Sequence, residues 1–260
     1  MPTSPQSCRR VPLATDPVLR VEGVAKRFGA LQAVDDVSFD VHAGEVVALL
    51  GDNGAGKSTL VNILSGTIKP DSGRILFDNQ VAELHNPGSA KSLGIETVYQ
   101  DLSLCPNVDV VANFFMGREL VKRVLGVPIL DEGRMEQETA LALSDLGVSL
   151  PSLRIQVEHL SGGQRQAIEL SRFIHWGGRL VLLDEPFAAL GVEQTRLGLE
   201  LIARAQSEGV AVIVITHNLV HAFQVADRAV VLRLGHVAGV RSMAETDHAE
   251  LIDLITGATS

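Results

Sequence analysis

Four runs of consecutive, mostly apolar residues restrict the possible folds more than any other feature of the sequence. They occupy residues 45–51, 180–183, 210–215 and 229–232. Such runs are typical of strands that are buried on both faces, and with helices between them these strands form a mostly parallel sheet. The sequence therefore predicts an α/β fold around a mostly parallel core sheet.

Two further segments have a different pattern. Residues 18–24 and 37–41 alternate between apolar and polar side chains. Alternation of this kind indicates strands with one exposed face, so we expect an antiparallel β subdomain beside the core sheet.

Helical spacing replaces the apolar runs between about residues 101 and 173. For example, Leu141, Leu143 and Leu146 precede Gly147. We expect this stretch to be an α-helical subdomain inserted into the α/β core.

The length of 260 residues is sufficient for one large domain with a substantial core. Residues 1–17 are rich in Pro, Ser and Thr, which predicts a flexible N-terminal tail. Residues 18–260 are then expected to form the single folded domain.

Charge and cysteine content limit the possible partners and the compartment. The chain has 22 basic and 31 acidic residues, a net charge of −9, which opposes broad binding to a phosphate backbone, so we expect no nucleic-acid partner. Two cysteines, Cys8 and Cys105, cannot form a disulfide framework and favour a reducing cytosolic compartment. The sequence offers no apolar stretch long enough to span a bilayer and no signal-peptide core.

A glycine-rich loop follows the first apolar run and fits the pattern G-x-x-x-x-G-K-[ST], with an expected helix after it. The glycines let the backbone wrap around a phosphate, which then faces the positive N-terminal end of the helix. Lys57 would neutralise the β- and γ-phosphates, and the Ser58 hydroxyl would ligate Mg²⁺. A chance match in a glycine-containing loop is the alternative, and the strand before and helix after the loop argue against it. The predicted nucleotide-binding residues are Gly51, Asp52, Asn53, Gly54, Ala55, Gly56, Lys57, Ser58 and Thr59.

Two carboxylates end the apolar run at residues 180–183. Asp184 and Glu185 lie where a buried strand leaves the sheet, the edge at which open parallel sheets bind ligands. Asp184 would hold Mg²⁺, and Glu185 would be the general base that polarises the attacking water. Solvated carboxylates also close many strands, but a phosphate loop upstream favours the functional interpretation.

The pentapeptide Leu160-Ser-Gly-Gly-Gln164 lies between the phosphate loop and the acidic strand end, ahead of an amphipathic helix over residues 165–173. Ser161 could simply cap that helix. In this position, however, the pentapeptide closely resembles the signature of the ATPase subunits of ABC transporters, which are P-loop NTPases. The resemblance covers nearly the whole chain from about Val18.

In that family the signature binds the γ-phosphate of an ATP molecule held by the other protomer. A helix N-terminus with close-approach glycines suits this task. The resemblance therefore implies nucleotide binding in trans by the signature segment, in a homodimer with two ATP molecules at its interface. The residues concerned are Ser161, Gly162, Gly163 and Gln164.

Three other positions match the family in order. Gln100 resembles the Q-loop glutamine, which senses Mg²⁺ and the attacking water; His217 resembles the switch histidine that contacts the γ-phosphate. Phe28 resembles the aromatic residue that stacks on adenine. Taken singly, they could be an exposed polar residue, a capping or core histidine, and a packing aromatic.

The chain departs from the general family pattern at two places. Phe187 stands where the family usually has Thr, and Gly191 stands where many members have Asp. Because that Asp helps organise the opposite site, Gly191 concerns coupling between sites and not ATP binding.

Four segments, residues 51–57, 98–104, 188–192 and 217–219, resemble the ATPases of bacterial monosaccharide importers of the ribose, xylose and fructose type, most of all single-domain fructose-type members. This resemblance implies a subunit that hydrolyses ATP to energise sugar uptake through a separate integral membrane permease. The subunit would be peripheral, on the cytoplasmic face of the inner membrane, and would serve an external sugar-binding protein indirectly.

Several alternatives remain open at this point. The chain could be a soluble ABC-type ATPase that acts on nucleic acid or ribosomes, an importer ATPase for another solute, or a monomeric P-loop kinase or GTPase. Residues 102–108 and 113–116 could form the surface that docks on the permease, or equally well part of the core.

Overall fold

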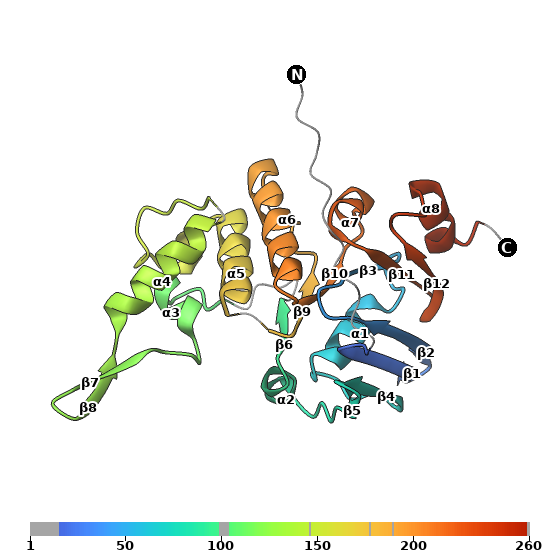
Figure 1. Cartoon of the computed structure of the whole chain (residues 1–260), viewed down its shortest axis with the longest axis horizontal. Coiled ribbons are helices and arrows are strands. Elements are labelled where there is room, and N and C mark those ends of the chain that lie inside the picture. Colours follow the sequence, from blue (N-terminus) through green and yellow to red (C-terminus); the bar gives the residue numbers. More distant parts are fainter. Residues whose placement is uncertain (1–15, 99–103, 146, 177, 189, 259–260) are drawn as a thin grey trace, which may run out of the picture.

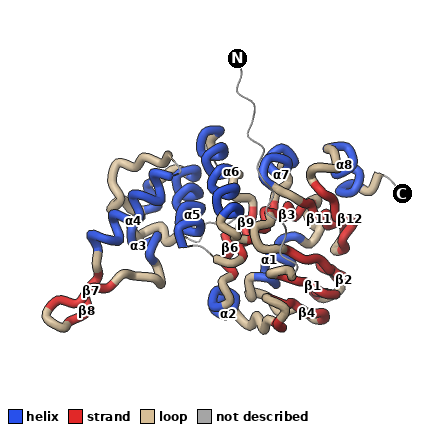
Figure 2. The backbone as a smooth tube through the Cα atoms, in the orientation of Figure 1, coloured by secondary structure: helices blue, strands red, loops and turns tan. Residues whose placement is uncertain are grey.

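The computed structural model describes residues 16–98, 104–145, 147–176, 178–188 and 190–258. Its centre is a six-stranded sheet that is parallel except for β12 at one edge (Figures 1 and 2). In spatial order its strands are β12 (His236–Ser242), β11 (Arg228–Arg233), β3 (Val46–Leu50), β10 (Ala211–Ile215), β9 (Leu180–Asp184) and β6 (Ile95–Val98).

All five residues of β3, of β9 and of β10 are buried. Side chains of successive residues point to opposite faces of the sheet, because the repeat of a strand is two residues. Leu180 and Leu182 accordingly belong to one core cluster, and Val181 and Leu183 to another. The expected mostly parallel, doubly covered sheet is confirmed.

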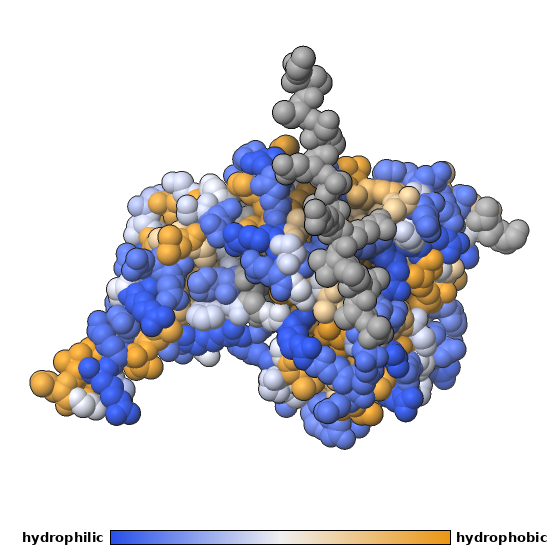
Figure 3. Space-filling view, in the orientation of Figure 1, coloured by the Kyte–Doolittle hydropathy of each residue, from blue (hydrophilic) through white to orange (hydrophobic). Residues whose placement is uncertain are grey.

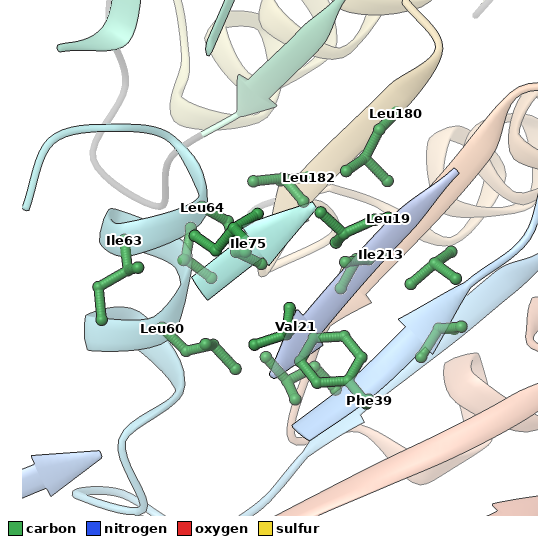
Figure 4. Close-up of a cluster of buried hydrophobic side chains, with 14 of the residues drawn as sticks. Leu19, Val21, Phe39, Leu60, Ile63, Leu64, Ile75, Leu180, Leu182 and Ile213 are labelled. Atoms are coloured by element: carbon green, nitrogen blue, oxygen red, sulfur yellow. The ribbon is translucent and has the colours of Figure 1, made fainter. Parts of the chain in front are cut away.

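A second, antiparallel sheet packs against one face of the core sheet. Its strands, in spatial order, are β2 (Leu31–Val41), β1 (Leu19–Phe28), β4 (Ser72–Phe77) and β5 (Gln80–Val81). With α1 (Lys57–Leu64) it buries a cluster that includes Leu19, Leu60 and Ile213 (Figure 4). The sequence predicted β1 and β2 from their alternation but not β4 and β5, and α2 (Pro87–Ser92) follows as a short helix.

Four helices cover the other face of the core sheet (Figure 1). They are α5 (Gly162–Trp176), α6 (Val192–Ser207), α7 (Leu219–Val225) and α8 (His248–Thr256). Leu170 of α5 and Leu201 of α6 pack on Val181 and Val214, which closes this layer.

The chain between β6 and β9 projects from one side of the sheet (Figure 1). It contains α3 (Val110–Phe115), α4 (Glu132–Asp145), the 3₁₀ turn η1 (Val157–His159) and α5, as the helical spacing predicts. It also contains a β-hairpin, β7 (Val121–Val124) and β8 (Val127–Leu130), that the sequence did not predict. The limits of the inserted subdomain and of the N-terminal tail stay predictions, and residues 1–15 lie outside the described part of the chain.

The aromatic pair in α3 resolves one alternative. Phe114 and Phe115 are completely buried and pack with Met135 and the Trp176 ring, whose Nε1 donates to the Phe114 carbonyl oxygen at 3.1 Å. These aromatic residues are core and not a docking surface, because they supply the apolar centre of the projecting segment.

Candidate active site

Three loops meet at one edge of the core sheet because β3, β10 and β9 are parallel neighbours. The register aligns Leu49 with Ile215, and Ile215 with Asp184. The phosphate loop after Leu50, the turn with His217 and the acidic strand end at Glu185 therefore leave the sheet side by side. This is the edge at which parallel sheets bind ligands.

The backbone of the phosphate loop has a shape that only glycine allows at two positions. Gly51 has φ +152° and Gly56 has φ +103°. A Cβ at Gly51 would lie 2.3 Å from the Leu232 oxygen, and one at Gly56 would lie 2.3 Å from the Ala33 oxygen. The loop can thus pack on β11 and β2 and curve back into α1.

Lys57 lies inside the curve of this loop. Its Nζ donates to the carbonyl oxygens of Gly51 at 2.8 Å and Asp52 at 2.9 Å. Burial lowers the pKa of Lys57, while the charges of Glu185 and Asp184 oppose the shift. Among the described side chains none caps the N-terminus of α1, so the first-turn N–H groups, the Lys57 ammonium and the exposed Ser58 hydroxyl suit a phosphate.

Asp184 is 7% exposed at the end of β9. Burial, and then the neighbouring charge of Glu185, raise the pKa of Asp184 to about 6, and Lys57 counteracts this. A buried carboxylate in this setting gains from a cation beside it. Asp184 and the Ser58 hydroxyl are oxygen donors of the kind Mg²⁺ prefers, so the residues present fit that ion.

The Glu185 carboxylate is held from the neighbouring loop. Its Oε1 accepts from the backbone N–H of His217 at 2.9 Å and lies 2.6 Å from His217 Nδ1. The Thr216 hydroxyl donates to Oε2 at 3.3 Å. The structure thus brings together two predicted residues that are 32 positions apart, and it orients the carboxylate while His217 stays largely exposed.

Glu185 itself has a left-handed backbone, with φ +49°. Three hydrogen bonds hold this conformation. Its N–H donates to the Ile215 oxygen at 2.9 Å, and its carbonyl oxygen accepts from Gln166 Nε2 at 2.9 Å and from the Ala188 N–H at 3.2 Å. Sequence analysis missed Gln166. Its signal is faint, since a buried glutamine on the apolar face of α5 reveals a partner only in three dimensions.

The signature segment begins α5. The Ser161 hydroxyl accepts from the Gln164 N–H at 3.2 Å, and Gln164 Oε1 accepts from the Ser161 N–H at 3.0 Å, so these two residues do cap the helix. Beside them lies a cleft of about 440 Å³, lined also by Gly163, Leu190 and Gly191. Figure 1 shows α5 and α1 apart from each other, and no residue of the phosphate loop is among the described residues that line this cleft.

Phe28 and Gln100 are the remaining predicted site residues. Phe28, at the end of β1, is 46% exposed, and the Lys26 Nζ lies 5.7 Å from its ring centre. A ring with this exposure can stack on a base. Gln100 lies outside the described residues.

The two departures from the family pattern have different surroundings. Phe187 is buried against α6, where Gly198 leaves room for its ring, and stacks edge-on with His221 at 5.3 Å between centres. The large ring is therefore part of the core. Gly191 precedes α6 and lines the cleft beside the signature segment.

The loop, the lysine and the acidic strand end define a phosphate-binding site of the P-loop type. Residues 34–188 match the family model described as ABC transporter. The chain belongs to this family.

Relatives in the family have sugar-import names. The chain is 41% identical over 239 residues to the xylose/arabinose import ATP-binding protein of Sulfolobus acidocaldarius, covering 92% of this chain and 94% of the relative. It is 39% identical to the fructose import ATP-binding protein of Rhizobium meliloti, covering 95% and 96%. A ribose import ATP-binding protein of Rubrobacter xylanophilus is 38% identical, and the match spans 47% of that longer protein.

Solved structures agree on the fold. An ATP-binding cassette of an ABC transporter, MJ1267, superposes with a TM-score of 0.78 at 25% identity, covering 92% of this chain and 99% of that one. The dimeric cassette MJ0796 superposes with a TM-score of 0.76 at 22% identity, covering 86% and 98%. In the described part of this chain, no helix combines the length and apolar character needed to cross a bilayer.

Proposed function

We propose that this chain is the ATP-hydrolysing subunit that energises uptake of a monosaccharide through a separate membrane permease. The observation that carries the proposal is the match to two sugar-import ATP-binding proteins at 41% and 39% identity, each covering at least 92% of both chains. The site geometry suits ATP hydrolysis, because the phosphate loop, Asp184 and Glu185 lie together at one edge of the core sheet.

ATP would bind with its phosphates in the loop of residues 51–59. The N–H groups at the start of α1 and the Lys57 ammonium would hold the β- and γ-phosphates, and Phe28 would stack on the adenine. Ser58 and Asp184 would hold Mg²⁺, with Gln100 as a third contact, and the ion would neutralise phosphate charge when bound.

Glu185 would act as the general base on the attacking water. The two contacts to His217 fix Oε1, so the carboxylate can orient water without searching through rotamers. His217 would also reach the γ-phosphate, since its ring is mostly exposed beside Glu185.

A second copy of the chain would complete the site. The signature segment lies apart from the phosphate loop of its own chain, yet it is a helix N-terminus with glycines, which suits an anion. Ser161, Gly162, Gly163 and Gln164 of each protomer would bind the ATP of the other. Two ATP molecules would then lie in the interface of a homodimer, and their hydrolysis would reopen it.

Binding to the permease would hold the chain at the cytoplasmic face of the inner membrane. Sugar choice would rest with the permease and with an external binding protein, which the chain serves only through the permease. Fructose, ribose and xylose are the candidate sugars, from the relatives' names.

An affinity pull-down of the tagged chain from gently solubilised native membranes tests the transport role. We expect recovery of a multi-spanning permease, and ATP hydrolysis that rises with the binding protein and its sugar. The Lys57→Ala chain is the matched control, because it should recover the permease without sugar-dependent hydrolysis. Recovery of soluble partners or nucleic acid alone would overturn the importer role and leave the ATPase chemistry intact.

A further inference from the structure

The β7–β8 hairpin is the most exposed apolar element among the described residues. Every residue of both strands is exposed. Figure 1 shows the hairpin projecting from the end of the molecule remote from the core sheet, and Figure 3 shows apolar side chains gathered at its tip. Its large exposed apolar residues are Val121, Val124, Leu125, Val127, Ile129 and Leu130. A contiguous apolar surface of this kind marks an interaction site.

The apolar side chains lie on both faces of the hairpin. Val121 pairs with Leu130, and Val124 pairs with Val127. Because positions 121 and 124 are three residues apart, these two pairs point to opposite faces. Leu125 at the turn is completely exposed. A protein groove would cover one face and leave the other in water, whereas the interfacial layer of a bilayer surrounds an inserted tip.

The charge of the hairpin favours an anionic surface. Residues 121–130 contain two cations, Lys122 and Arg123, and no acidic residue, in a chain of net charge −9. Lys122 pairs with Asp131 at the base of the hairpin at 3.0 Å, and Arg123 has no ion pair with any described residue. Long basic side chains can lay their stems along apolar groups while their heads reach lipid phosphates.

We propose that the β7–β8 hairpin inserts its tip into the headgroup region of an anionic bilayer. The hairpin would give the chain a direct lipid contact in addition to the permease. This deepens the proposed function and depends on it only in placing a membrane beside the chain.

Vesicle flotation of the full chain without a permease tests this contact. We expect binding to vesicles of phosphatidylcholine with phosphatidylglycerol, and little binding to phosphatidylcholine alone. Leu125→Ser should weaken binding about tenfold, and Arg123→Glu should weaken it by about thirtyfold at low salt. Leu234→Ser is the matched control, because Leu234 is also an exposed leucine followed by glycine, and these two residues have nearly the same φ as Leu125 and Gly126. Lys69→Glu is the control for the charge reversal.

ATP hydrolysis in the same preparations separates the two proposals. The lipid contact would be supported if all variants hydrolyse ATP normally, the hairpin variants lose vesicle binding and the control variants keep it. Normal hydrolysis without vesicle binding, or equal binding by Leu125→Ser and wild type, would overturn it and leave the proposed function standing. Two outcomes would assign the hairpin to protein contacts instead. One is self-association in sedimentation that depends on Leu125, and the other is loss of permease recovery by Leu125→Ser when the wild type binds no vesicles.

A second inference comes independently from Gln166. This residue is 8% exposed, and its Nε2 donates to the carbonyl oxygen of Glu185, whose φ is +49°. A left-handed backbone at a non-glycine residue persists only where neighbours hold it. The geometry points to Gln166 as a positioning residue for the Glu185 base. Gln166 lies in α5 with Gly163, and Ser161 caps the same helix, so α5 links the signature segment, assigned above to the partner's ATP, to the base of its own site.

Steady-state and single-turnover kinetics of Gln166→Met test this role, which rests on the proposed ATPase chemistry. We expect kcat to fall about fivefold to tenfold with KM unchanged, because one of the hydrogen bonds that hold the backbone of Glu185 is lost. In a Glu185→Gln background the same change should cost nothing further, a result that general misfolding cannot produce. Gln137→Met, an exposed change on α4, is the control. An unchanged kcat, or an equal fall in both backgrounds, would refute the positioning role, whereas absent hydrolysis by wild type would refute the proposed function.

Discussion

Replacing Glu185 by Gln tests the assignment of the general base most directly. The change keeps the size of the side chain and an oxygen that can accept from the His217 N–H, which is 2.9 Å from Oε1. The amide cannot take a proton from water. Loss of a positioned general base slows a reaction by about 10²–10⁴-fold, so kcat for ATP should fall within that range.

The structure also predicts how little the fold should change. The variant keeps the packing of Glu185 and replaces charge-assisted hydrogen bonds from His217 and Thr216 by neutral ones. Since charge-assisted bonds are roughly twice as strong as neutral ones and three are affected, we expect a loss of about 1–3 kcal/mol in the free energy of unfolding. A folded domain has about 5–15 kcal/mol of stability, so the variant stays folded and a fall in kcat of a hundredfold or more does not come from unfolding.

Phosphate release under steady-state conditions measures kcat, and urea unfolding measures stability. Size-exclusion chromatography with ATP should show the variant as a stable dimer, because ATP binds but is not consumed. Turnover within threefold of wild type would remove Glu185 from the role of base, and a dimer that forms without ATP would contradict the nucleotide-dependent interface.

Three further predictions concern other parts of the site and the fold. Lys57→Ala should weaken ATP binding by about ten- to a hundredfold in calorimetric titration, since a charged hydrogen-bond donor to phosphate is lost; unchanged affinity would contradict the phosphate-loop assignment. Arg228→Met should destabilise the chain by about 3–5 kcal/mol in urea unfolding, because Arg228 donates to Glu45, which is 3% exposed, and its loss leaves that carboxylate buried without a cation. Burial raises the pKa of Asp40, but the hydrogen bonds and charges of Arg228 and, to a smaller extent, His42 outweigh this and leave the pKa below 3.8. The Asp40 carboxylate thus stabilises the fold above pH 3.8, and the stability gap between wild type and Asp40→Asn should close as the pH falls through the lowered pKa; a gap that persists in acid would refute this linkage.

Local patterns in the sequence determined much of this protein. The apolar runs predicted the buried strands β3, β9, β10 and β11, because a strand covered on both faces needs consecutive apolar residues. Alternation predicted β1 and β2, since one face of each strand stays polar. The phosphate loop was recognisable because its chemistry lies within nine consecutive residues.

Short strands and the exposed β7–β8 hairpin were not predicted from the sequence. β5 has two residues and β6 has four, too few to show a period. The hairpin has apolar residues on both faces and cations between them, so it matches neither the helical nor the alternating pattern. Its exposure, like the complete burial of Phe114, depends on which other segments pack nearby.

Only the tertiary structure decided which distant groups meet. The strand order, which separates neighbours in the chain, brings Glu185 to His217 across 32 residues and Arg228 to Glu45 across 183. It also brings Gln166 to the backbone of Glu185, a contact that no local sequence pattern predicts. Residue types and their spacing fix local conformation and the chemistry available, whereas the pairing of strands and the packing of helices, summed over the whole core, fix where that chemistry is assembled.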